Sequence, residues 1–141
     1  MRSCLPVLVA FVALASVGSA SAALDSFRTP SGNIGCMYAK FSGEPAYLRC
    51  DILSGLKPKP PRPSSCPDYV EWGYGYSMGK TGKASAVCAG DTAVVPDAKV
   101  LGYGRSWSRN GFSCTSLERG LRCRNASGHG FFLSRQRSYK F

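Results

Sequence analysis

Six cysteines between residues 36 and 123 constrain the fold of this chain more than any other feature. Six cysteines in a small exported domain are typical of three disulfides formed in an oxidising compartment. The alternative is a metal site, but none of the six forms a Cys-x-x-Cys pair, and His129 is the only histidine. We therefore predict three disulfides, no metal and no cofactor.

The first 22 residues have the pattern of a secretory signal peptide. Arg2 precedes an apolar run over residues 5–17, and Ala20-Ser21-Ala22 fits the small-x-small cleavage rule. The alternative is a membrane anchor, but the run is shorter than the about 20 residues that cross a bilayer, and no second run follows. We predict a signal peptide over 1–22 and one disulfide-rich β domain over 23–141. The domain would be secreted or held in the periplasmic or cell-envelope space.

Two similar segments suggest how the cysteines pair. In each, glycine and asparagine precede a cysteine, and Leu-Arg-Cys follows after a loop: residues 32–36 with 48–50, and residues 110–114 with 121–123. If each forms a β-hairpin, its two cysteines lie opposite each other at about 4.5–5.5 Å between Cα atoms, which a disulfide tolerates. Several connectivities are open to six cysteines. We predict Cys36–Cys50 and Cys114–Cys123, which leaves Cys66–Cys88.

Alternating patterns favour strands over helices after residue 23. In residues 70–78 a large apolar side chain occupies every even position, which places five of them on one face of a strand as core or as a glycan platform. Further strands are predicted over 33–40, 46–53, 84–89, 98–103, 110–115, 120–125 and 129–134. The prediction is an all-β sandwich or small barrel of about seven or eight short antiparallel strands. A short helix within 64–82 is an alternative.

The segment 57–63 contains four prolines and favours polyproline II. It could be a ligand for an aromatic groove. Because the segment is internal, we expect a stiff spacer that keeps this edge from pairing.

Positive charge is concentrated in the C-terminal third. Residues 23–141 carry 17 Lys and Arg against 8 Asp and Glu, a net charge of +9. Residues 105–141 hold eight of these cations, seven of them Arg, against the single acid Glu118. Arginine binds phosphate and carboxylate through paired hydrogen bonds, so a basic end suggests an anionic partner. The partners considered are an anionic envelope polymer, an anionic lipid surface, an acidic protein and, with less support, nucleic acid.

Five residues are predicted to bind this partner: Arg105, Trp107, Arg109, Arg135 and Arg137. If residues 105–109 are extended, Arg105, Trp107 and Arg109 share a face, and an aromatic ring between guanidinium groups can hold a sugar or a base. The alternative is that Trp107 packs into the core beneath the arginine stems.

Two other functions stay open. A small secreted hydrolase such as a ribonuclease needs a carboxylate base, an imidazole acid and a cation, which Glu44, Glu71 or Glu118 could supply with His129, although no spacing joins them. The second open function is inhibition of a secreted enzyme. A basic lysozyme does not fit as the target, because a chain with a net positive charge does not complement it. The predicted function is therefore non-catalytic binding.

The order of several motifs resembles a family of small exported bacterial proteins of unknown function. The motifs are Pro30-Ser31-Gly32-Asn33-Ile34-Gly35-Cys36, Leu48-Arg49-Cys50-Asp51, Cys88-Ala89-Gly90-Asp91, Val100-Leu101-Gly102-Tyr103-Gly104 and Gly128-His129-Gly130-Phe131. The resemblance implies a bacterial, exported protein and supplies no activity or catalytic residue.

Overall fold

The computed structural model describes residue 13, residue 18 and residues 22–141, in which the chain forms strands and no helix. The predicted signal peptide and Cys4 lie almost wholly outside the described residues. The strands are β1 Ala23–Arg28, β2 Ile34–Lys40, β3 Tyr47–Ile52, β4 Trp72–Gly79, β5 Ser85–Cys88, β6 Lys99–Val100, β7 Ser106–Arg109, β8 Phe112–Leu117, β9 Gly120–Arg124, β10 Gly130–Leu133 and β11 Ser138–Lys140. The predicted all-β class is confirmed.

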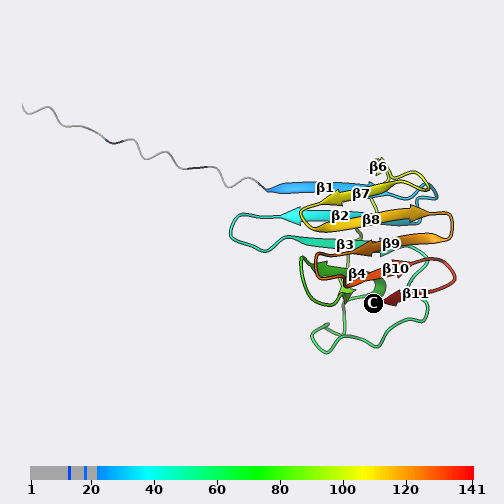
Figure 1. Cartoon of the computed structure of the whole chain (residues 1–141). Coiled ribbons are helices and arrows are strands. Elements are labelled where there is room, and N and C mark those ends of the chain that lie inside the picture. The colour runs from blue at the N-terminus through cyan, green and yellow to red at the C-terminus, as the bar shows by residue number, and fades with distance from the viewer. Residues whose placement is uncertain (1–12, 14–17, 19–21) are drawn as a thin grey trace, which may run out of the picture.

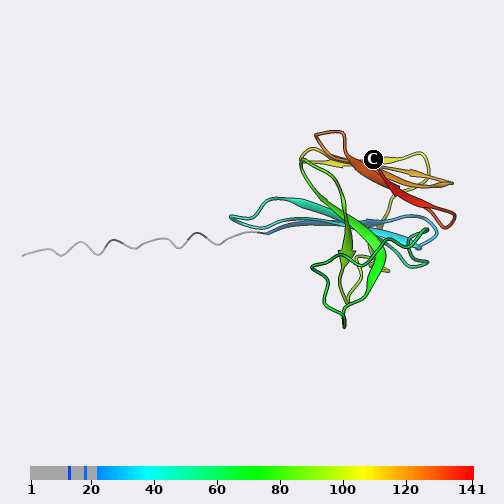
Figure 2. The same ribbon diagram turned by 90° about the horizontal axis from the view of Figure 1, so that it is seen from below.

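The strands form two sheets, which overlie each other in Figure 1 and appear as separate layers in Figure 2. The N-terminal sheet has the order β5-β4-β3-β2-β1-β6, and the C-terminal sheet has the order β11-β10-β9-β8-β7. Strand pairs are antiparallel except for the short parallel pair of β1 with β6. The two inner faces together form one apolar core, so the arrangement is a sandwich.

The sequence pattern misses β1, β7 and β11, which brings the strands in the described residues to eleven rather than seven or eight. β7 and β11 are sheet edges of four and three residues, too short to show a clear alternation. The helix considered within 64–82 is absent, because most of that range is loop and β4.

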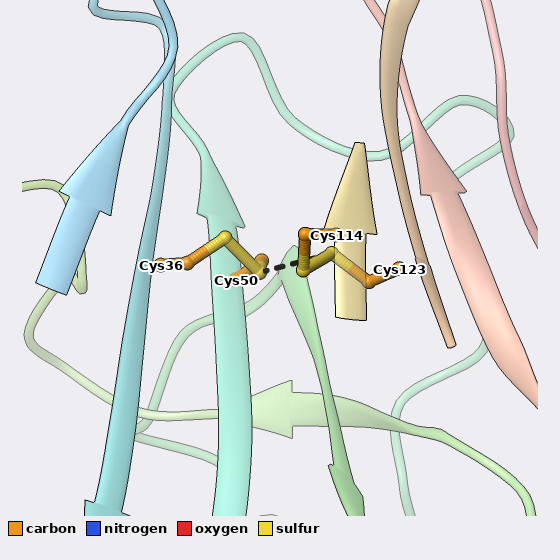
Figure 3. A group of neighbouring side chains, drawn as sticks. All are labelled: Cys36, Cys50, Cys114 and Cys123. Atoms are coloured by element: carbon orange, nitrogen blue, oxygen red, sulfur yellow. Dashed lines mark hydrogen bonds between the residues drawn. A yellow bond between two sulfur atoms is a disulfide. The ribbon is translucent and has the colours of Figure 1, made fainter. Parts of the chain in front are cut away.

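Two disulfides lie against each other in the centre of the core (Figure 3). Cys36–Cys50 joins β2 to β3, and Cys114–Cys123 joins β8 to β9, each across directly paired positions. The Sγ atoms of Cys50 and Cys123 are 3.8 Å apart, and all four cysteines are at most 1% exposed. The third disulfide is Cys66–Cys88, so the pairing is the one that the spacing predicts.

The apolar face of residues 70–78 divides between the core and the surface. Tyr76 and Met78 are buried in the core, whereas Tyr74 is 47% exposed. The pairing of β4 with β5 shifts register between Trp72 and Tyr76, and Gly73 has a φ of +87°. This irregularity ends the simple alternation, so the expectation of five side chains on one face is wrong for the first part of the strand.

The proline-rich segment packs on Trp72. The ammonium of Lys59 and the guanidinium of Arg62 lie 3.9 and 4.0 Å from the centre of its ring, and the indole Nε1 donates to the carbonyl of Pro60 at 2.9 Å. Its first residue, Lys57, accepts a hydrogen bond from the backbone N–H of Ser138 at the start of β11. These contacts are those of an internal spacer that also holds the edge of the C-terminal sheet.

Removing a core disulfide should cost more than removing the outer one. Loop closure alone would make the outer disulfide slightly more stabilising, because Cys66–Cys88 closes 22 residues and Cys36–Cys50 closes 14. Each closure stabilises the fold by about 3 kcal/mol on the chain-entropy model. The core pair also loses buried sulfur contacts and leaves a cavity. In urea unfolding, Cys36→Ala with Cys50→Ala should lower the free energy of unfolding more than Cys66→Ala with Cys88→Ala. The reverse order would contradict this account.

Candidate functional site

The outer face of the C-terminal sheet carries the arginines of β9. Side chains alternate along this strand, so the buried Leu121 and Cys123 place Arg122 and Arg124 on the opposite face, where both are exposed. The inward direction of Cys123 is fixed by its disulfide. The core therefore determines that two arginines point away from the molecule.

Three aromatic rings lie beside these arginines at the C-terminal edge. Phe132 on β10 pairs with Tyr139 on β11, and their rings stack with centroids 5.3 Å apart at 29°. Phe141, which exchanges backbone hydrogen bonds with Gly130, follows with its ring 6.4 Å from that of Tyr139 at 54°. Phe131 and Leu133 point into the core, so these three rings belong to the outer face.

An arginine lies over each of the three rings. The guanidinium carbon is 5.5 Å from the ring centre for Arg119 over Phe132, 5.2 Å for Arg137 over Tyr139, and 3.8 Å for Arg122 over Phe141. Such cation–π contacts hold a guanidinium in one orientation and leave its N–H edge available. We call these six residues the arginine–aromatic cluster: Arg119, Arg122, Phe132, Arg137, Tyr139 and Phe141.

Two glycines make room for the rings. A Cβ at Gly130 would lie 2.8 Å from Cζ of Phe141 and would collide with the carbonyl of Cys123. Gly120 has a φ of +149°, and a Cβ there would lie 2.6 Å from Cζ of Phe132. The rings can therefore lie close to the sheet only because β9 and β10 have no side chain at these positions.

The cluster has no acidic partner in the part of the chain that the structure describes. None of its arginines forms an ion pair there, since the ion pairs involve Arg49 and Arg109. Glu118 is the single acid of residues 105–141. Three guanidinium groups on neighbouring rings repel one another, and this repulsion would be relieved by a bound anion.

The residues predicted from the sequence fall into two groups. Arg105 precedes β7, while Arg135 and Arg137 lie in the turn from β10 to β11, and these segments meet the turn of Arg119 at one end of the sheet. A groove of about 180 Å³ at this end is lined by Arg119 and Arg135 together with Asn33 and Tyr103. Arg119 and Arg122 were not predicted. Alternation around Cys123 is the signal that identifies Arg122.

Trp107 and Arg109 face the other sheet. Trp107 pairs with Cys114 on the inner face of β8, its ring lies 5.2 Å from that of Phe27, and its Nε1 donates to Oδ2 of Asp25 at 2.8 Å. Arg109 lies 4.8 Å above the ring of Tyr38 and 3.7 Å from the same carboxylate. These contacts join β7 to β1 and β2 of the other sheet. Trp107 therefore packs against the core, which is the alternative considered for it from the sequence.

His129 lies beside the last residues of the C-terminal sheet. Its Nδ1 is 3.3 Å from the carbonyl oxygen of Phe141, and the adjacent groove is lined by Lys83, Lys140 and Phe141 besides His129. None of Glu44, Glu71 and Glu118 lines this groove, so the structure does not group them with His129 as the hydrolase hypothesis requires.

Among the described residues, the four core cysteines form a group of metal-ligand residue types whose sulfur atoms lie within 4.8 Å of one another. All four are in disulfides. Metal ions bind thiolates, so the sulfurs in this state stabilise the core and are not ligands.

A third groove, of about 360 Å³, lies on the N-terminal sheet beside Trp72 and Tyr74. It is lined by Arg49, which donates to the carboxylates of Asp51 at 2.7 Å and Asp91 at 3.0 Å. Burial acts to lower the pKa of Arg49, but its hydrogen bonds to these two carboxylates outweigh that effect and raise the pKa. The donors of Arg49 are used in fixing the loop at Asp91, which indicates a structural role.

Replacing Gly130 should disturb the cluster selectively. Gly130→Ala should lower the free energy of unfolding by about 1–3 kcal/mol, because the added methyl collides with backbone and with Phe141. The control is Gly90→Ala, where a Cβ meets nothing within 4 Å. Thermal unfolding of both variants tests this, and equal midpoints would show that the space under Phe141 is unimportant.

A model of a protein family described as a family of unknown function (DUF6636) matches residues 4–141. No curated protein and no solved structure matches the chain. In the described part of the chain no helix is long and apolar enough to cross a membrane. The family description names no ligand or reaction, so the function is argued from the outer face of the C-terminal sheet.

Proposed function

We propose the function from the site itself, because the chain belongs to DUF6636, a family of unknown function. The protein is an exported, non-catalytic binding protein that recognises an anionic polymer of the cell envelope. Binding takes place on the outer face of the C-terminal sheet, through Arg119, Arg122 and Arg137, with Arg105 and Arg135 at the end of the same sheet.

One observation supports this proposal most strongly: three guanidinium groups held on three adjacent rings without a carboxylate partner among the described residues. Contact with a ring restricts each guanidinium group before the anion arrives, so less conformational freedom is lost on binding. A basic surface built only for solubility would not require the rings or the glycines beneath them.

The same geometry favours a polymer over a lipid surface. Membrane insertion needs exposed apolar side chains, but Phe132 is 3% exposed, Tyr139 and Phe141 are partly buried, and a guanidinium group lies over each ring. The cluster therefore presents charge and hydrogen-bond donors, which fit a chain of anionic groups.

Export is part of the proposal. Three disulfides in a small domain are typical of proteins outside the cytoplasm or in the periplasm. The sequence of residues 1–22 has the signal-peptide pattern, and cleavage after it would leave the domain 23–141. An anionic polymer of the envelope is the partner that such a domain meets after export.

Binding should depend on salt and on the cluster. The protein should be retained on immobilised dextran sulfate at low salt and released as salt rises, because counterions compete for the polymer. Replacing Arg119, Arg122 and Arg137 by Gln should lower the slope of log affinity against log salt by about 0.7 for each arginine that contacts the polymer.

The matched control is Lys99→Gln, which removes one exposed positive charge from β6 of the other sheet. It should bind almost as the parent does, whereas Arg122→Lys should bind less tightly than the parent although it keeps its charge. Binding that falls equally in Lys99→Gln and Arg122→Gln would show that net charge, and not the cluster, holds the polymer.

A further inference from the structure

We infer that the polymer bound by the arginine–aromatic cluster is a polyol phosphate: an acyclic chain of polyols joined by phosphodiesters. This inference rests on the proposed function and names its ligand class. It depends on three features of the outer face: the uneven spacing of the rings, the covering of their faces, and the hydroxyl groups beside the arginines.

The spacing of the rings favours a flexible ligand. The centroids of Phe132, Tyr139 and Phe141 are separated by 5.3 and then 6.4 Å, and the planes turn by 29° and then 54°. The guanidinium carbons also lie at unequal distances from the ring centres, 5.5, 5.2 and 3.8 Å for Arg119, Arg137 and Arg122. An acyclic phosphodiester chain can bend to place one phosphate at each of such unevenly arranged arginines, which a stiff chain of pyranose rings with a fixed repeat does less readily.

The covering of the rings disfavours nucleic acid. Single-stranded nucleic acid gains much of its affinity by stacking bases on free aromatic faces. Phe132 has Tyr139 stacked on it and Arg119 over it, and Arg122 lies 3.8 Å from the centre of Phe141. The rings are occupied by the protein's own arginines, so a ligand gains little from carrying bases.

Hydroxyl groups adjoin the arginines on the same face. Thr115 on β8 pairs with Arg122, and its hydroxyl is 2.9 Å from that of Ser106 on β7. Ser113 pairs with Arg124 in the next row. Each hydroxyl can both donate and accept, so the strands beside the cluster can bind the free hydroxyls of a polyol while the arginines bind its phosphates.

The test compares four ligands of equal charge number at one salt concentration, by calorimetry with the protein of residues 23–141. They are a glycerol phosphate oligomer, a galacturonate oligomer, a single-stranded oligonucleotide and inorganic polyphosphate. The glycerol phosphate oligomer should bind at least about tenfold more tightly than the galacturonate oligomer and the oligonucleotide, a difference of about 1.4 kcal/mol. Arg122→Gln should weaken its binding, while Lys99→Gln should not.

A second variant tests the hydroxyls. Thr115→Val keeps the shape of the side chain and should weaken binding of the glycerol phosphate oligomer, but not of polyphosphate, which has no polyol hydroxyls. Equal binding of all four ligands, tighter binding of the galacturonate oligomer, or an unchanged Thr115→Val would overturn the ligand class and leave the proposed function standing. Tighter binding of the oligonucleotide would overturn the ligand class and the proposed envelope partner together. If none of the four ligands binds, the ligand class and the proposed function are both overturned.

Discussion

The contact between the Cys36–Cys50 and Cys114–Cys123 disulfides determines which side chains of both sheets face inward. Each disulfide joins two neighbouring strands of its own sheet, and the sulfurs of Cys50 and Cys123 meet across the core at 3.8 Å. Because side chains alternate along a strand, fixing one cysteine inward fixes its neighbours outward. On β9 those neighbours are arginines, so the covalent centre of the core also builds the charged outer face.

The central hairpins could be predicted from the sequence, whereas the edges of the sheets could not. The two Leu-Arg-Cys motifs predicted the pairing because each closes a hairpin in which the cysteines lie directly opposite. The charge of residues 105–141 likewise identified the basic sheet. The direction of the Trp107 side chain could not be predicted in the same way. An extended segment does not reveal which of its faces is buried until the register of β7 with β8 is known.

The cluster itself combines residues from three places in the chain. Arg119 comes from a turn, Arg122 from β9, and Arg137 from the turn before β11. Their association depends on the pairing of β9, β10 and β11, which brings Phe132 and Tyr139 together. No local pattern contains this information, although applying alternation to Leu121-Arg122-Cys123-Arg124 would have placed two arginines on the outer face.

The claim that the cluster binds the polymer is tested most directly by NMR of the protein with labelled arginine side chains. Addition of a glycerol phosphate oligomer should shift the Nε–Hε resonances of Arg119, Arg122 and Arg137, and leave those of Arg49 and Arg62 unchanged. Arg49 and Arg62 are held by contacts within the N-terminal sheet and the proline-rich segment. Shifts confined to Arg49 and Arg62, or spread equally over all arginines, would contradict a binding site on the C-terminal sheet.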